Sequence, residues 1–183
     1  MPLPLSKMCA DYNDRIAALR AIDVPISDIT VADICSRAGI SRKRFYTLFG
    51  EKEGVFRWYL DLCFTASLYE IGRSFTWLEG IEACLFYIAE ENDVFAASYR
   101  TRAEPPIRYW PMNQARINEM RATLESKGIK IDQALEVEME LYSATVPSLI
   151  RQWVELNGAV SIGEFASCWR DCVPGKLRAA LEL

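Results

Sequence analysis

The chain has 183 residues, of which 51% are apolar, so it can bury a core and is not expected to be disordered. Its formal net charge is −4, but residues 1–60 carry nine Lys and Arg against seven Asp and Glu, whereas residues 61–183 carry twelve against eighteen. No apolar stretch approaches the roughly 20 residues that span a bilayer, and the opening MPLPLSKM lacks the pattern of a signal peptide. We therefore expect a soluble, cytoplasmic protein with a basic N-terminal part and no membrane partner.

An amphipathic helix is predicted first, over about residues 6–21. Its apolar residues Met8, Tyr12, Ile16 and Leu19 recur at spacings of four, four and three, which places them on one side of a helix. We expect this helix to brace the elements that follow it.

Two short helices joined by a glycine turn are predicted next, in the run TVADICSRAGISRKRFYTLFGEK at 30–52. Thr30 and Asp33 have the spacing of a capping box, which starts a helix. Gly39 permits the sharp turn at the end of this helix, and Ser41 is suited to cap the next one. The second helix has an apolar set, Phe45, Leu48 and Phe49, and an outward set, Arg42, Lys43, Arg44, Tyr46 and Thr47. A basic helix of this kind fits the major groove of DNA.

Helices are also predicted along the rest of the chain, and no segment has a convincing strand pattern. A fourth helix is expected from about Glu51 to Ser74, because its apolar residues keep helical spacing without a proline. Breaks at glycine, proline and asparagine then delimit five more helices, near 77–91, 94–103, 111–127, 132–156 and 161–173. The predicted fold class is all-α, with about nine helices.

The segment from about Lys7 to Leu60 resembles the N-terminal domain of the TetR/AcrR family of transcriptional regulators. The parts that carry the resemblance are ITVADIC at 29–35, AGISRKRFY at 38–46 and FGEKEGVF at 49–56. Less specifically, YIAEENDVFAA at 87–97 and IRQWVELNGAVSIGEFA at 150–166 are similar to short Gram-positive members, a group that includes regulators similar to those of dihydroxyacetone kinase. The resemblance implies a three-helix DNA-binding head with a helix-turn-helix over residues 1–50. It also implies a helical effector-binding and dimerisation body over residues 51–183.

The resemblance divides the residues of the head by role. DNA affinity comes largely from phosphate contacts, whereas specificity comes from side chains that reach base edges. The implied phosphate contacts are Thr30, Tyr46 and Lys52, and the base-reading candidates are Arg42, Lys43, Arg44 and Thr47, which follow Ser41 on the same helix. The alternative for Arg42 to Arg44 is a solvated basic face. The expected partner is a pseudo-palindromic operator in double-stranded DNA.

Aromatic residues are concentrated in the expected body. Ligand pockets are mostly apolar with a few polar groups, and the resemblance implies such a pocket here. The candidate lining residues are Phe64, Tyr69, Phe86, Phe95, Tyr99, Tyr109 and Trp110. An ordinary hydrophobic core is the alternative for each of them. The expected ligand is a small organic molecule of unknown identity.

The last two predicted helices are apolar on more than one side. Such breadth indicates burial both against the body and against a second copy of the chain, as in a two-fold four-helix bundle. The candidate interface residues are Tyr142, Thr145, Leu149, Trp153, Phe165 and Trp169. A homodimer is therefore expected.

The chain contains no histidine, which argues against most hydrolytic triads and against histidine metal sites. We expect no enzyme activity, no catalytic residue, no cofactor and no metal site. The six cysteines include no CxxC pair and are interpreted mainly as buried core thiols. Cys168 and Cys172 are the exception, because they lie one helical turn apart and form a redox or thiol-reactive pair if they are exposed.

The sequence thus predicts a homodimeric, sequence-specific DNA-binding regulator of transcription, controlled by an organic effector. Repression is the default in the family that it resembles. The alternative is a TetR-like dimeric interaction module that acts mainly through a protein partner rather than by its own DNA binding. DNA binding by the purified protein separates the two.

Overall fold

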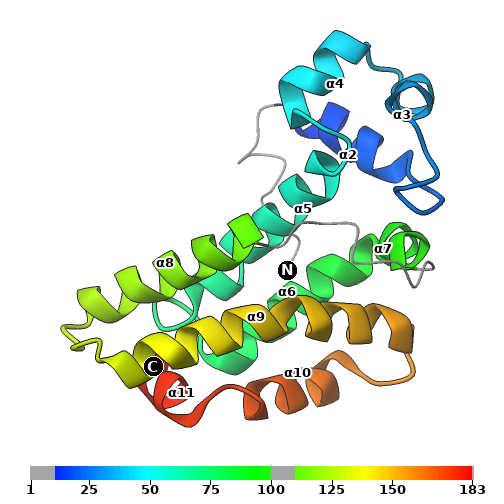
Figure 1. Cartoon of the computed structure of the whole chain (residues 1–183). Coiled ribbons are helices and arrows are strands. Elements are labelled where there is room, and N and C mark those ends of the chain that lie inside the picture. The colour runs from blue at the N-terminus through cyan, green and yellow to red at the C-terminus, as the bar shows by residue number, and fades with distance from the viewer. Residues whose placement is uncertain (1–10, 100–109, 183) are drawn as a thin grey trace. The chain divides into compact units, whose positions relative to one another are not determined.

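The computed structural model describes residues 11–99 and 110–182. These residues form ten α-helices and one 3-10 helix, and apart from an isolated bridge between Ile71 and Phe75 they contain no β structure, so the predicted all-α class is confirmed (Figure 1). The described chain divides into two compact units, residues 11–62 with 91–99 and residues 63–90 with 110–182. The boundary expected at residue 50 separates a DNA-binding part from an effector-binding and dimerisation part. The division into compact units does not test these roles, so this boundary stays a prediction.

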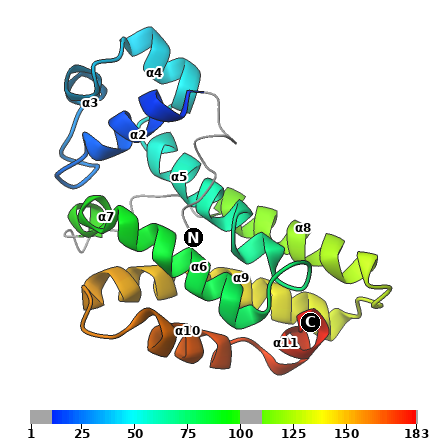
Figure 2. The same ribbon diagram turned by 180° about the vertical axis from the view of Figure 1, so that it is seen from behind.

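The first unit contains α2 (Tyr12–Arg20), α3 (Val31–Ala38), α4 (Arg42–Phe49), most of α5 (Gly54–Thr65) and α7 (Asn92–Tyr99). Within this unit α3 packs against both α2 and α4 (Figure 2). Phe95 of α7 packs on α5, with ring centroids 5.8 Å from Phe56 and 5.9 Å from Tyr59. The core of the unit includes Leu19, Ile22, Ile34, Phe45, Val55 and Phe56.

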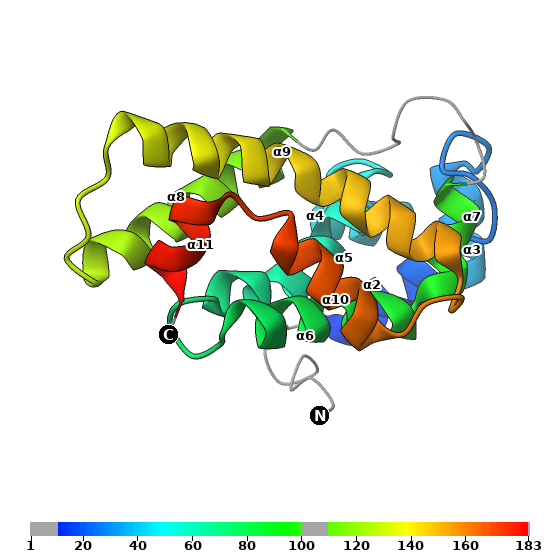
Figure 3. The same ribbon diagram turned by 90° about the horizontal axis from the view of Figure 1, so that it is seen from below.

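The second unit contains the 3-10 helix η1 (Leu68–Glu70), α6 (Trp77–Glu90), α8 (Trp110–Ser126), α9 (Gln133–Leu156), α10 (Ile162–Asp171) and α11 (Gly175–Leu181). In this unit α8 packs along α9 and α10 packs along α6, while α11 contacts α8 and α9 (Figure 3). Its core includes Trp77, Ile81, Leu124, Met139, Val146, Ile150 and Trp169.

The helix expected over Glu51–Ser74 is wrong at its C-terminal end, because α5 stops at Thr65. The carbonyl of Glu70 accepts the backbone N–H groups of the three residues at 73–75, so the chain turns here. Gly72 adopts a φ of 78°, in the left-handed region that favours glycine. Apolar residues keep helical spacing through this segment. However, the N–H groups of residues 73–75 bind the Glu70 carbonyl in the turn, so they do not form the hydrogen bonds of a longer helix.

The sequence did not predict α11. This helix has seven residues and buries two leucines, Leu177 and Leu181, one turn apart, which is too short a pattern to detect. The indole Nε1 of Trp77 donates to the carbonyl of Arg178 over 3.0 Å, so tertiary contacts hold the helix in place. Of the helices expected over 6–21 and 94–103, residues 6–10 and 100–103 lie outside the described part.

Candidate nucleic-acid interface

Helix α3 begins at a capping box, as its sequence predicts. The Asp33 N–H donates to Thr30 Oγ1 over 3.2 Å, and the Thr30 N–H donates to Asp33 Oδ2 over 3.1 Å. The hydrogen bond from the Thr30 hydroxyl, followed by the bond from its N–H, lowers the pKa of Asp33 below the ordinary value of 3.8. The cap therefore keeps a charged carboxylate at the start of α3.

The turn between α3 and α4 spans residues 39–41. Gly39 has a φ of 69°, and its N–H donates to the Cys35 carbonyl, which ends α3. The Arg44 N–H donates to Ser41 Oγ over 3.1 Å, which starts α4. Both features agree with the sequence prediction. The tight turn brings the first residues of α4 close to the end of α3.

Helix α4 separates a buried face from an exposed one. Phe45, Leu48 and Phe49 are buried, and the ring centroids of the two phenylalanines are 5.1 Å apart. The exposed side chains are Arg42, Lys43, Tyr46 and Thr47. At about 100° per residue, these four fall within an arc of about 140°. Tyr46 is 53% exposed, so an aromatic ring and two cations share one solvent-facing surface, which we call the α4 outer face.

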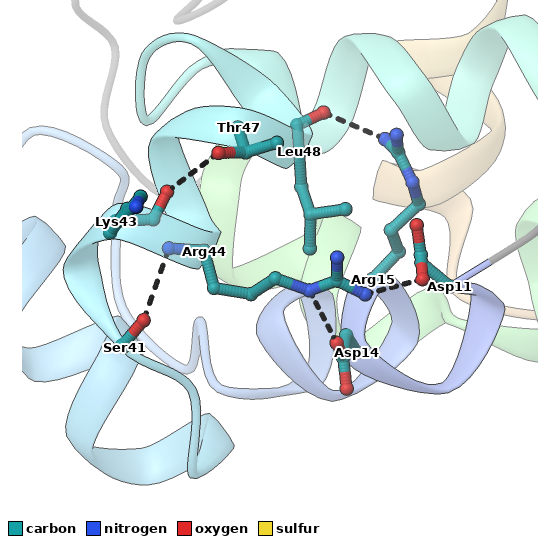
Figure 4. A network of polar contacts seen from close by, with 8 residues as sticks. All are labelled: Asp11, Asp14, Arg15, Ser41, Lys43, Arg44, Thr47 and Leu48. Atoms are coloured by element: carbon teal, nitrogen blue, oxygen red, sulfur yellow. Dashed lines mark hydrogen bonds and ion pairs between the residues drawn. The ribbon is translucent and has the colours of Figure 1, made fainter.

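Arg44 does not belong to the α4 outer face. Its Nε donates to Asp14 Oδ2 over 2.8 Å, and its Nη2 donates to Asp11 Oδ1, as Figure 4 shows. These bonds, that to Asp11 first, raise the pKa of Arg44. Arg44 must therefore release two carboxylates at the start of α2 before it can reach a base edge.

Arg15 of α2 also holds α4, although no sequence pattern marked it. Its Nη1 donates to the Leu48 carbonyl over 2.8 Å (Figure 4), and its guanidinium carbon lies 5.3 Å from the Phe49 ring centroid and 5.6 Å from that of Trp58. A cation at the C-terminal end of a helix interacts favourably with the helix dipole. Arg15 and Arg44 thus fix α4 to α2 at two points.

Lys52 lies near the start of α3. Its Nζ donates to the Ile29 carbonyl over 3.2 Å, and Ile29 directly precedes Thr30, the cap of α3. The structure thus brings together two of the three residues that the resemblance implies as phosphate contacts. The first turn of α3 adds backbone N–H groups, which favour an anion.

The remaining cations of residues 37–52 differ in what they contact. Arg37 donates to Asp23 Oδ1 and, over 3.1 Å, to the Ala21 carbonyl, and the bond to Asp23 lowers the pKa of that carboxyl. Within the described part of the chain, neither Arg42 nor Lys43 pairs with a carboxylate. These two side chains are therefore available to an external phosphate or base.

Of the aromatic residues proposed for an effector pocket, four have described side chains, and these fall in both units. Phe64 and Tyr69 lie in the second unit with ring centroids 6.2 Å apart, Phe95 lies in the core of the first, and Phe86 is exposed. Tyr109 and the side chains of Tyr99 and Trp110 lie outside the described part.

A small cavity of about 10 Å³ does lie in the second unit, with room for about one water molecule. Its walls include Leu68, Tyr69, Ile71, Trp77, Arg116, Glu119, Met120, Thr123, Tyr142 and Leu181. An organic effector would require these side chains to move apart.

Arg116 is a polar group of this cavity that was not among the predicted site residues. It is only 2% exposed, its Nε donates to Ser143 Oγ over 3.2 Å, and its Nη2 donates to the Ser143 carbonyl over 3.0 Å and to Asn113 Oδ1. Its guanidinium carbon lies 5.2 Å from the Phe64 ring centroid. Arginine is almost never fully buried unless it is paired, so its residue type did not mark it as buried.

The residues proposed for a subunit interface fall into two groups. Tyr142, Trp153, Phe165 and Trp169 are buried inside the second unit, where the Trp153 and Phe165 ring centroids are 5.3 Å apart. Thr145 is exposed and Leu149 is half-buried. Buried side chains have little surface left for a partner, so these four serve mainly the core of their own unit. The large apolar side chains that α9 exposes are instead Val137 and Leu141, which are 47% and 58% exposed.

The cysteines are also divided. Cys35, Cys63 and Cys84 are buried, which agrees with core thiols, and burial raises the pKa of Cys84 to about 12. Cys168 and Cys172 are exposed, and Cys9 lies outside the described part.

Over residues 11–99 and 110–182, no three His, Cys, Asp or Glu side chains are grouped as metal ligands. Among the helices of those same residues, none has the length and apolar character to cross a membrane.

No protein-family model matches the sequence, and a search among curated proteins finds no match either.

Proposed function

We propose that the chain is a sequence-specific DNA-binding regulator of transcription, in which α3, the turn and α4 form a helix-turn-helix. The observation that carries this proposal is the α4 outer face, which presents Arg42, Lys43, Tyr46 and Thr47 on a short helix whose opposite side is buried. A helix of this size enters the major groove, where base edges carry a distinct pattern of donors and acceptors.

The contacts within the first unit support different roles for its cations. Arg42 and Lys43 are free of carboxylates within the described chain, so we assign base reading to them, with an arginine able to bind a guanine edge through two hydrogen bonds. Lys52 and the first turn of α3 suit a phosphate, and Tyr46 suits a second one. We assign Arg44 to positioning, because Asp11 and Asp14 already hold it.

The distribution of charge supports an orientation in which α3 and α4 face the DNA. Five cations face a single acid, Glu51, between Arg37 and Lys52, whereas residues 61–183 carry an excess of six acids. Positive potential over the proposed reading elements attracts phosphates, and negative potential elsewhere disfavours other orientations.

We also propose that the regulator is a cytoplasmic homodimer without catalytic activity, and that it represses transcription until a small organic effector binds. Two copies would present their α4 helices to successive major grooves roughly 34–36 Å apart on a pseudo-palindromic operator. The cavity beside Arg116 is the candidate effector site, although it must enlarge. An effector that favours the enlarged form shifts the population between states with different operator affinity.

Selection of bound sequences from a random DNA pool with the purified chain tests the proposal. We expect a two-fold related consensus, and a gel shift that competitor DNA of another sequence does not abolish. The double variant Arg42→Ala/Lys43→Ala serves as the control, since it removes the two free cations of α4 and should lose the consensus. Binding indifferent to sequence, or no binding, would contradict the proposal and favour action through a protein partner.

A further inference from the structure

Two cysteines share the C-terminal turn of α10. Cys168 and Cys172 are both exposed, whereas the other three cysteines that the structure describes are buried. The Cys172 N–H donates to the Cys168 carbonyl over 3.2 Å, so the two residues are one helical turn apart. Residues four apart on a helix lie on the same face, which makes them neighbours on the surface.

The turn that carries these thiols is fixed to the core of the second unit. Trp169 and Val173, each next to one of the cysteines in the sequence, are buried. The Cys172 N–H also lies within hydrogen-bonding distance of the Trp169 carbonyl, at 3.0 Å. The backbone therefore holds the two cysteine positions at a set separation rather than in a loose tail.

That separation disfavours a direct disulfide. Helix neighbours four apart have Cβ atoms about 5–6 Å apart, whereas a disulfide requires about 3.5–4.5 Å. An atom inserted between the two sulfurs removes this conflict, because it lengthens the bridge by one bond. Thiolates prefer soft acceptors, so the inserted atom is expected to be a soft one.

We propose that Cys168 and Cys172 form a dithiol site for a soft, thiophilic acceptor with two exchangeable positions, of which a monosubstituted trivalent arsenical is the type. With phenylarsine oxide as the probe, C6H5AsO and two thiols give one cyclic dithioarsonite and one water. Two As–S bonds form, the two thiol protons leave on the oxygen as water, and no oxidation or reduction takes place. The reaction with the arsenical does not require the proposed DNA binding.

The first experiment is intact-mass measurement of the native full chain treated with phenylarsine oxide. We expect one phenylarsenic group per chain, which remains in an excess of a monothiol and is removed by a small dithiol. A bidentate adduct resists a monothiol because both As–S bonds must be replaced, whereas adducts at single cysteines are exchanged. Alkylation after treatment should label one pair of thiols fewer than in the untreated chain.

Variants locate the adduct. Cys168→Ser and Cys172→Ser should each lose the adduct that resists a monothiol, and Cys9→Ser should retain it. The matched control is Cys168→Ser/Arg170→Cys, which restores the number of thiols but places them two residues apart, where helix side chains do not face each other. This control should also lose the adduct.

A second readout is the melting temperature, which should rise on treatment of the unaltered chain and not of the Cys168→Ser chain, because the bridge restrains the end of α10. The inference is overturned if no adduct survives the monothiol, if the adduct survives in either single-serine variant, or if it depends on Cys9. It is also overturned if the native thiols do not react because the subunit contact covers them.

Discussion

Arg42, Lys43 and Arg44 are consecutive in the sequence, but their surroundings differ. A basic triplet gives no sign of which member is held by the protein, because the carboxylates of Asp11 and Asp14 come from another helix end. On α4 the first two side chains point to solvent, and the third turns toward α2. Reading and positioning roles therefore follow from partners rather than from residue type.

Substitutions in the triplet should separate these roles. Arg42→Ala or Lys43→Ala should relax the preference at a defined base pair by about 1–3 kcal/mol, since under the proposed function each variant removes a side chain that would bind a base edge directly. Arg44→Ala should weaken binding to all sequences without changing the preferred one, because α4 loses an anchor to α2. Competition between the selected operator and its single-base variants measures both effects.

The matched control for Arg44 is Asp14→Asn, which removes a carboxylate partner and leaves α4 unchanged. If Arg44 only positions α4, Asp14→Asn should weaken DNA binding to all sequences in the same way but by less, because Asp11 still holds Arg44. Relaxed preference at one base pair with Arg44→Ala but not with Asp14→Asn would show that Arg44 leaves its carboxylates and reads a base.

Lys52 should act through phosphate alone. Lys52→Ala should weaken binding to every sequence and reduce the slope of log affinity against log salt by about one unit for each phosphate that the lysine neutralises. Filter binding over a range of salt concentrations measures the slope. Lys130→Ala is the control, because Lys130 is exposed in the second unit and removal of its charge should leave the slope unchanged. Equal slopes for all three proteins would exclude Lys52 from the interface.

At the scale of elements, several helices start with the same device. Thr30 with Asp33, Thr76 with Glu79, and Ser161 with Glu164 each join a hydroxyl to a carboxylate three residues on. The hydroxyl and N–H bonds lower the pKa of all three carboxyls. A lowered folded-state pKa means that the stabilisation is complete above the ordinary pKa and is lost as the pH falls through the folded one.

The capping carboxylates should therefore make the melting temperature depend on pH in the acid range. The melting temperature should begin to fall as the pH drops below about 4.5, the ordinary pKa of Glu, because protonated caps lose their charge-assisted bonds. Glu164→Gln keeps an acceptor for the capping box but cannot titrate. The difference in melting temperature between the unaltered chain and this variant should shrink as the pH falls. A difference in melting temperature that stays constant at every pH would show that Glu164 contributes no pH-dependent stability.

Sequence patterns predicted helices well where a local signal existed. The capping box at Thr30, the glycine turn at Gly39 and the two faces of α4 depend on residues within a few positions of one another, and all three were found, except that Arg44 was placed on the outer face. The end of α5 depends on a turn whose carbonyl acceptor, Glu70, has no signature of its own. Likewise Arg15 and Arg116 act through contacts 27 or more residues away, which periodicity does not report.

At the scale of the whole molecule, the aromatic residues of α9 and α10 serve two possible purposes that the sequence could not separate. A helix that is apolar on more than one side can be buried entirely within its own chain or partly against a second copy. The burial of Trp153 and Trp169 inside the second unit assigns them mainly to its core. The exposed leucine and valine of α9 then become the apolar surface that a second copy would cover.

A charge at Leu141 should prevent association without unfolding the chain. Leu141 is 58% exposed, so Leu141→Glu adds no strain to the isolated chain, but in a dimer it buries an unpaired carboxylate. We expect a loss of about 3 kcal/mol or more, which corresponds to a rise of at least about a hundredfold in the dimer dissociation constant. Sedimentation measures association, and circular dichroism checks that the helices remain.

Three further variants test where the subunit contact lies. Ala89→Glu adds the same charge at an exposed position of α6 and should leave a dimer intact if the contact lies on α9. Trp169→Ala should instead lower the free energy of unfolding by about 3–5 kcal/mol, because it leaves a cavity in the core. Leu149→Glu tests the half-buried edge of the same surface. If the Leu141 and Leu149 variants both stay folded and dimeric, the subunit contact lies elsewhere. In that case two α4 helices need another route to the half-site spacing of an operator.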